Sequence, residues 1–436
     1  MSGPEVTCAG CGRTVDPALA LPFRCPAARV DDDVDHILRT SAPSDWAADL
    51  TSDNPFIRYR TRTLAYQMAR AHGMSDEDFV ACVVSLNDAI AEVDGRGFER
   101  TPLVCSSEVL DGEEVWLKVE IDNVSGSHKA RHLMSVMVYL EVARRLDLPV
   151  AQGLSSRPLA IASCGNAALG AAVVARAAQW PLDVFIPPDA SPSVVARLEA
   201  LEARVHVCPR VDETPGDPCV HAFRAAVASG SLPFGVQGNE NGLAVEGGKL
   251  LGYELIEQLR GEGATLGALF IQVGGGALGS GCMQALREAH AAGVLPALPA
   301  LYTVQTHGAF PLAEAYRAVT ELSGSLSERM AHAVTHRRAF MRPWPTAPHS
   351  VAHGILDDET YDWAELVAGM AESGGTAVLA TEAQLLAANA RVEQALGLSV
   401  CHTGTAGLAG AQSACAGGVA LPPGGIGVLL TGAARD

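Results

Sequence analysis

The chain has 436 residues, with 31 Lys or Arg against 49 Asp or Glu, and its formal net charge is −18. A chain this acidic lacks the positive surface that holds a polyphosphate backbone, so nucleic acid is excluded as a partner. Hydrophobic residues make up 48% of the chain and glycines number 44, which is typical of a globular α/β protein with many tight turns.

No stretch reaches the roughly 18 uninterrupted apolar residues of a membrane helix, and the first residues carry Glu, Asp and Cys in place of a basic, then apolar, leader. We therefore expect a cytoplasmic protein without a membrane partner. The eleven cysteines are an odd number, which argues for reduced thiols. Five of them lie in or beside apolar segments and are expected to be buried: Cys82, Cys164, Cys208, Cys282 and Cys401.

Lysine is scarce. Only three of the basic residues are lysines, namely Lys118, Lys129 and Lys249. Any chemistry that requires a primary amine therefore has three candidate residues.

Residues 1–100 are expected to form an irregular, acidic extension that wraps the main body. It opens with a cluster of cysteines, continues with an Asp-rich run at 31–35, and then shows a helical pattern over 58–70. A second helix is predicted from a Ser75 cap to Ile90.

From Val115 the pattern changes to alternating strands and helices. A strand over 115–120 precedes a helix whose Leu133, Val136, Met137 and Leu140 share one face. The next segments predict a βαβαβ unit with a parallel sheet. Its strands are expected at 159–162, 182–186 and 205–207, and its helices at 166–179 and 193–203.

A second open sheet is predicted from residue 268 onward. Strands are expected over 268–273 and 301–305, and the chain closes with a buried strand over 426–430.

A glycine-rich turn at 274–281 follows the first of these strands and opens a helix. Its free amides favour a single phosphate group. A dinucleotide would need an acidic residue about 20 positions on, and 301–307 contains none. A purely structural turn stays open as an alternative.

Two other helix starts carry polar side chains. Ser163-Cys164-Gly165-Asn166 suits a carboxylate or an anionic ring oxygen, although Asn166 could simply cap the helix. Lys129 stands at the start of the amphipathic helix, where positive charge and desolvation lower the pKa of an amine and make it nucleophilic. The alternative is an ordinary solvated lysine.

Taken together, these three segments resemble the fold-type II pyridoxal 5′-phosphate (PLP) enzymes, which include threonine synthases, serine/threonine dehydratases and cysteine synthases. The resemblance runs from about Thr101 to the C-terminus. It implies a tryptophan-synthase-β-like α/β fold of two lobes with open twisted sheets. A large PLP-binding domain would comprise 101–129 and 241–436, and a smaller inserted α/β domain 130–240.

The resemblance also implies roles for individual residues. Lys129 in Ser127-His128-Lys129-Ala130-Arg131 matches the Schiff-base lysine and would be the catalytic residue, and Asn166 matches the contact to the ring oxygen. Thr403 in Thr403-Gly404-Thr405-Ala406 matches the contact to the ring nitrogen. The phosphate would bind Gly274, Gly275, Gly276, Ala277 and Leu278, and the substrate would bind Ser127, Ser163, Cys164 and Gly165.

The implied reaction is an elimination or replacement on an amino acid, because a neutral hydroxyl at the ring nitrogen disfavours transamination. The segment Val245-Glu246-Gly247-Gly248-Lys249 resembles threonine synthases, which convert phosphohomoserine to threonine and phosphate. A serine/threonine dehydratase, a β-replacement synthase of the cysteine synthase type and a non-catalytic PLP-binding protein stay open. The nearest arginine for a phosphorylated substrate is Arg131, and Cys164 is expected to be a core residue rather than a second base. Family members are often homodimers, which is the implied assembly.

The N-terminal cysteines resemble the small cysteine ribbon of some threonine synthases, but the ribbon is incomplete. Cys8, Cys11 and Cys25 are present, and Ala28 stands where the fourth cysteine belongs. His36 or an Asp of 31–35 could complete a zinc site. We expect a metal-free remnant, so zinc is not an expected cofactor.

Overall fold

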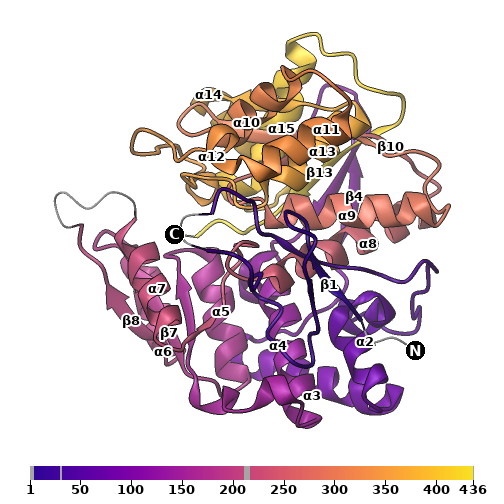
Figure 1. Cartoon of the computed structure of the whole chain (residues 1–436). Helices are drawn as coiled ribbons and strands as arrows, with labels where there is room; N and C mark the ends of the chain where they lie inside the picture. Colours follow the sequence, from indigo (N-terminus) through magenta and orange to yellow (C-terminus); the bar gives the residue numbers. More distant parts are fainter. Residues whose placement is uncertain (1–3, 30–31, 211–216, 436) are drawn as a thin grey trace.

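The computed structural model describes residues 4–29, 32–210 and 217–435 (Figure 1). The N-terminal extension contains a small antiparallel sheet of order β2-β1-β3. Its strands are β1 Val6–Cys8, β2 Thr14–Val15 and β3 Leu38–Thr40. The sequence did not predict this sheet, because strands of two or three residues are too short to show an alternating pattern.

A four-stranded parallel sheet confirms the predicted βαβαβ unit, with strand order β8-β7-β6-β9. The apolar run of β6 is buried at three of its four positions, because helices cover the sheet. The strands are β6 Leu159–Ala162, β7 Leu182–Ile186, β8 Arg204–Val207 and β9 Leu232–Pro233. The helices of this unit are α5 Asn166–Ala177, α6 Pro192–Ala200 and α7 Pro218–Ala228.

The second predicted sheet is also present and has six strands in the order β12-β11-β10-β13-β5-β4. Its neighbouring strands are parallel except at the edge, where β4 runs antiparallel to β5. The strands are β4 Leu103–Ser106, β5 Val115–Val119, β10 Leu266–Gln272, β11 Ala300–Thr306, β12 Ala377–Ala380 and β13 Gly425–Leu430. All seven residues of β11 are buried, as expected for a central strand of a parallel sheet.

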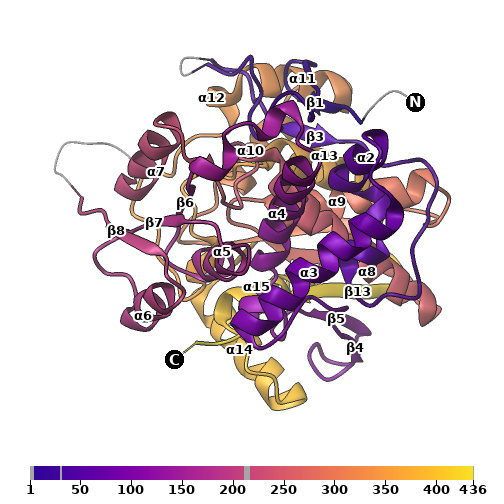
Figure 2. The same cartoon turned by 90° about the horizontal axis from the view of Figure 1, so that it is seen from below.

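Two long helices, α8 Val245–Gly261 and α9 Ala277–Ala291, lie side by side across the middle of the molecule (Figures 1 and 2). Helix α4 Lys129–Arg145 packs against α8 and α5. The remaining α-helices are α1 Pro55–Arg58, α2 Leu64–Ala71, α3 Asp76–Asp94, α10 Pro311–Thr320, α11 Leu326–Thr335, α12 Arg337–Phe340, α13 Trp363–Ser373, α14 Glu382–Leu396 and α15 His402–Ala416. Short 3-10 helices are η1 Arg60–Arg62, η2 Val124–Gly126, η3 Pro149–Ala151, η4 Leu154–Ser156, η5 Gly242–Ala244 and η6 His353–Ile355.

A fully buried network of charges joins β5, α4 and α8. Lys118 donates to Glu254 at 2.5 Å, and Arg131 pairs with Glu120 at 2.8 Å and with Glu254 at 2.9 Å. None of these four side chains has measurable exposure. The arginine considered for a phosphorylated substrate is therefore fully occupied inside the protein, and Arg131 is not available for that role.

The four-stranded sheet lies within 130–240, and the strands of the six-stranded sheet fall in 101–129 and 241–436. Helix α4 packs against both expected domains, because it contacts α5 of the smaller domain and α8 of the large one. The domain limits stay a prediction. The N-terminal extension bonds to several parts of the main body: Ala18 accepts from Val150, and Phe23 accepts from Gly242.

Close packing of α8 depends on its glycines. A Cβ added at Gly247 would lie 2.3 Å from the backbone nitrogen of His132 in α4. We predict that Gly247→Ala lowers the free energy of unfolding by at least about 2 kcal/mol, because backbone atoms of a buried helix cannot move aside. Denaturant unfolding followed by circular dichroism measures this change.

Gly261 provides the matched control, because it lies in the same helix and a Cβ there meets no heavy atom within 4 Å. Gly261→Ala should leave the stability unchanged or raise it by up to about 1 kcal/mol. Equal effects of the two substitutions would contradict the packing argument.

Candidate active site

Lys129 is the first residue of α4, directly after a tight turn. Ser125 in that turn has φ = 55°, and Ser127 bridges to Gly432 of the C-terminal segment. The Lys129 side chain is partly exposed, and within the described residues it forms no salt bridge. Desolvation lowers the pKa of its amine, while the Asp357 carboxylate acts in the opposite direction. This amine is therefore neutral, and nucleophilic, at a lower pH than an ordinary lysine.

The other two lysines are buried and held by carboxylates. Lys118 is paired with Glu254 as described above, and Lys249 lies 2.7 Å from Glu288. The two lysine side chains are 0% and 2% exposed. Of the three candidate amines in the sequence, only Lys129 is free to react.

The glycine-rich loop joins the end of β10 to the start of α9. Gly276 is in the left-handed region with φ = 98° and precedes the helix, so a side chain would strain the backbone there. Ala277 and Leu278 form the first turn of α9 and are buried. The loop thus presents a helix N-terminus with free amides, as a phosphate site requires.

A segment over 355–362 lies directly on this loop. A Cβ at Gly274 would come within 2.3 Å of Asp357 Oδ2, and one at Gly275 within 2.9 Å of the Tyr361 ring. Asp362 donates its amide hydrogen to the Gly275 carbonyl at 3.0 Å. No sequence pattern predicted this segment, because it has no periodicity, and its one available signal was the acidic run at 357–359.

Asp357 connects the loop to the lysine. Burial raises the pKa of its carboxyl to about 6, although Lys129 and the backbone amide of Gly275 both favour the ionised form. The carboxylate therefore lies beside Gly274 and Gly275 of the glycine loop and acts on the lysine amine.

Gly432 is the point at which the other predicted segments meet. It bridges to Ser127, its carbonyl accepts from the Cys401 amide at 3.0 Å, and a Cβ there would lie 2.8 Å from Asn166 Nδ2. Arg435 Nε donates to Asn166 Oδ1 at 2.8 Å, and the same guanidinium donates to the Ser125 carbonyl. No sequence pattern pointed to Gly432 or Arg435.

The turn before α5 contradicts two expectations from the sequence, one for Asn166 and one for Cys164. Gly165 is the N-cap and Asn166 the first helical residue, so the capping interpretation of Asn166 is wrong. Ser163 and Gly165 are partly exposed, and Cys164 is exposed. The expectation that Cys164 is a core residue is therefore wrong as well, because the turn ends the strand at the surface. Cys208 and Cys401, also expected to be buried, are partly exposed, whereas Cys82 and Cys282 are buried.

Thr403 lies in the first turn of α15, where Cys401 caps the helix. Its Oγ1 accepts the Gly354 amide hydrogen at 2.9 Å. The hydroxyl hydrogen is left to donate to a ligand. Since Gly354 adjoins the segment on the glycine loop, Thr403 and the loop belong to one site.

These groups fit a phosphorylated aldehyde with a heteroaromatic ring. A free amine faces the site, the glycine loop supplies amides for phosphate, and Thr403 and Asn166 supply polar contacts. Ser127, two residues before the lysine, is fully buried, and its Oγ has no hydrogen-bond partner among the described residues. Two open sheets with this set of residues define the class of fold-type II enzymes that use pyridoxal 5′-phosphate.

The sequence matches the family described as "Pyridoxal-phosphate dependent enzyme" over residues 96–432, so the chain belongs to this family. A threonine synthase of Mycobacterium leprae (strain TN) is 26% identical over 322 residues, which cover 73% of this chain and 76% of that protein. An L-serine dehydratase of Saccharomyces cerevisiae is 27% identical over 207 residues, which cover 46% of this chain and 59% of that protein.

Solved structures share the fold. The processed form of a threonine deaminase from Solanum lycopersicum has a TM-score of 0.60 at 17% identity, with 91% of this chain and 96% of that chain covered. Maize serine racemase has a TM-score of 0.57 at 18% identity, with 81% and 94% covered. Among the described residues, no helix has the length and apolar character needed to span a membrane.

The raised pKa of Asp357 predicts that the stability of the protein without added cofactor depends on pH. The folded state keeps its proton up to about pH 6, whereas the unfolded chain loses it near pH 4. Folding therefore binds a proton in this range, and stability falls as pH rises from about 4 to about 6. Asp357→Asn should remove this loss and become more stable than the wild type above pH 6, by up to about 3 kcal/mol.

Guanidinium unfolding of both proteins at several values from pH 4 to pH 8 measures the difference. Titrating groups that do not interact with Asp357 contribute equally to both curves and cancel. A difference that does not change with pH would refute the buried position of the carboxyl.

Proposed function

We propose that this chain is a PLP-dependent lyase that carries out an elimination or replacement on an amino acid, with Lys129 as the residue that binds the cofactor and moves the proton. The observation that carries the proposal is that Lys129 alone among the three lysines is not held in an ion pair. The lowered pKa of the Lys129 amine also disfavours a non-catalytic PLP-binding protein, because that role does not need an amine with a lowered pKa.

Bound PLP supplies an electron sink for the bond at the amino acid's α-carbon. The Gly274–Leu278 amides would hold the phosphate, and Asn166 and Thr403 would hold the ring. Ser163, Cys164, Gly165 and Ser127 would orient the substrate carboxylate. Lys129 would take the α-proton from the substrate, as its neutral amine allows.

The hydroxyl of Thr403 supports elimination over transamination. It already accepts the Gly354 amide hydrogen, and a neutral hydroxyl cannot keep a ring nitrogen protonated as a carboxylate would. A weaker electron sink favours loss of a β- or γ-substituent.

The charges around the site favour a substrate without phosphate. Asp217 and Asp358 act on the Asp357 carboxyl, and Asp189 and Asp217 act on Cys164. A phosphorylated substrate would add a second dianion, besides the cofactor's phosphate on the loop amides, next to these carboxylates, which is unfavourable. With Arg131 fully engaged, an ammonia-lyase reaction on a hydroxy amino acid such as serine or threonine fits this site best.

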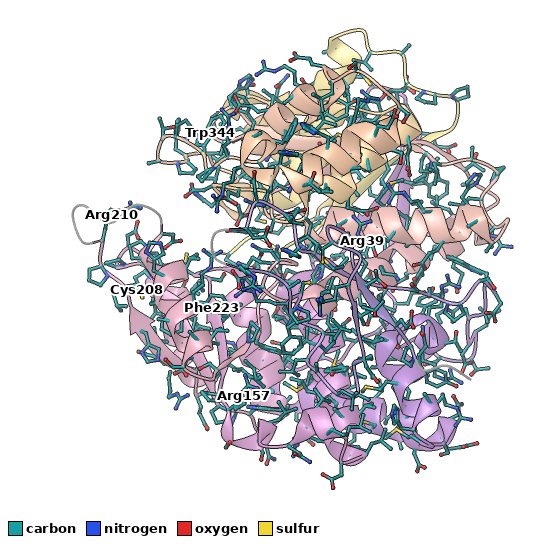
Figure 3. The ribbon with its side chains drawn as sticks, in the orientation of Figure 1. Arg39, Arg157, Cys208, Arg210, Phe223 and Trp344 are labelled. Carbon is teal, nitrogen blue, oxygen red and sulfur yellow. The ribbon has the colours of Figure 1, made fainter. Side chains whose placement is uncertain are left out.

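Threonine synthase is the second candidate, and similarity supports it. The relative from Mycobacterium leprae matches a larger share of this chain than the yeast dehydratase does. Two arginines are near the site as well. Burial raises the pKa of Asp358, and Arg210, labelled in Figure 3 beyond β8, opposes that rise. Arg224 pairs with Glu240 at 2.8 Å.

Reduction of the PLP-loaded protein with borohydride should fix the cofactor on Lys129 alone. Lys129→Ala should lose the visible absorbance of the bound cofactor and the labelled peptide, because the other two amines are buried in ion pairs. Peptide mapping by mass spectrometry measures this. A label at Lys118 or Lys249 in either protein would overturn the assignment.

A substrate panel separates the two candidate reactions. The loaded enzyme is mixed with serine, threonine, O-acetylserine and phosphohomoserine, while keto acid and phosphate are assayed together. We expect keto acid from serine or threonine and no phosphate from phosphohomoserine. Phosphate release with formation of threonine would establish the synthase instead, and spectral changes with O-acetylserine alone would indicate a β-replacement enzyme.

A further inference from the structure

Four metal-binding side chains meet in the N-terminal extension, far along the chain from the lysine site. Cys8 ends β1 and Cys11 lies in the turn to β2. Cys25 follows in the next loop, and His36 comes two residues before β3. Their ligand atoms all lie within 4.8 Å of one another.

Two of the distances between these ligand atoms are close to those of a tetrahedral metal site. Cys11 Sγ and Cys25 Sγ are 3.6 Å apart, and Cys8 Sγ is 3.4 Å from His36 Nδ1. With Zn–S bonds of about 2.3 Å and Zn–N bonds of about 2.0–2.1 Å, a tetrahedral centre separates two sulfurs by about 3.8 Å and a sulfur from a nitrogen by about 3.6 Å. A disulfide would instead need an S–S distance of about 2.05 Å.

The groups around the ligands are also arranged for a metal. The far nitrogen of His36, Nε2, lies 2.8 Å from Asp32 Oδ2, so Nδ1 faces the cysteines. A carboxylate on the second nitrogen is the usual partner of a zinc-bound histidine. The Ala27 amide donates to Cys25 Sγ at 3.4 Å, as amides do to thiolate ligands.

The turn that carries Cys8 and Cys11 depends on two glycines, one for close approach and one for its backbone conformation. A Cβ at Gly10 would lie 2.2 Å from the Asp35 carbonyl oxygen, and Gly12 has φ = 70°. Gly10 thus lets the turn approach the segment that carries His36. Three separate pieces of chain are brought to one point.

We propose that Cys8, Cys11, Cys25 and His36 bind one structural zinc ion, with Asp32 orienting the histidine. This proposal replaces the expectation of a metal-free remnant, which rested on the missing cysteine at position 28. The fourth ligand is the histidine that precedes β3, and a Cys₃His set with no open position is typical of a structural, non-catalytic site.

The site stabilises an extension that has little core of its own. The three strands contain two or three residues each, so metal binding would supply much of their folding free energy. The same extension bonds to distant elements: the Asp35 amide donates to Val334 of α11 at 2.7 Å, and Arg39, at the centre of Figure 3, pairs with Glu365 of α13 at 2.7 Å. Together with the hydrogen bonds to Val150 and Gly242, these contacts connect the zinc-held extension to distant parts of the molecule.

Metal analysis of the full-length protein tests the proposal. Protein purified under reducing conditions with zinc present should contain about one equivalent of zinc after dialysis. Replacement by Co²⁺ should give the visible absorption of a tetrahedral cobalt site and a thiolate charge-transfer band. Wild-type protein without bound zinc and without these bands would overturn the proposal, as would a Cys11–Cys25 disulfide that persists when zinc is present.

Variants locate the site. Cys11→Ser and His36→Ala should each weaken zinc binding by at least about tenfold in a chelator competition. Cys105→Ser, which removes an exposed cysteine in β4 outside the cluster, is the matched control and should bind zinc as the wild type does. Unchanged binding in both ligand variants would refute the assignment.

A measurement on the wild-type protein covers the case in which a variant does not fold. Removal of zinc with a chelator should lower the thermal midpoint, and added Zn²⁺ should restore it, whereas added Mg²⁺ should not. A midpoint that is the same with and without zinc would contradict the structural role. None of these readouts depends on the lysine site or on the reaction proposed for it.

Discussion

Two carboxylates, Glu254 and Glu288, hold two of the three lysines in ion pairs. Glu254 holds Lys118 and Arg131, and Glu288 holds Lys249. Because isolated buried charges are costly, each of these buried cations is fixed to its partner. The network therefore does two things at once: it anchors β5, α4 and α8 to one another, and it leaves Lys129, at the start of α4, as the one lysine that can react. The amine is carried by the helix that this network anchors.

The site forms where segments that are distant in the sequence come together. The glycine loop, the Asn166 turn and Thr403 each lie at a helix start, where backbone amides are unpaired. What unites them is the segment over 355–362 and the C-terminal residues around Gly432. Asp357 and Asp358 arrive with this segment and add negative charge beside the glycine loop.

Long apolar runs made much of the fold predictable. The strands over 159–162, 182–186 and 426–430, and the helix capped by Ser75, were expected within a few residues of their observed bounds. The missed features depend on long-range contacts that leave no local pattern. Arg435 donates to Asn166 although 269 residues separate them in the sequence. Asp357 is recognised as a site residue only by its contact with the glycine loop. The fourth proposed metal ligand is a histidine, which the spacing of the cysteines does not predict.

The scarcity of lysine has a consequence for the protein's exposure to reactive aldehydes and acyl donors. Such compounds attack any accessible amine, and most proteins present many lysines at the surface. Here Lys118 and Lys249 are 0% and 2% exposed, so Lys129 is the one lysine that such a reagent can reach. Selective capture of an aldehyde then needs no unusual reactivity, because competing lysine side chains are absent from the surface.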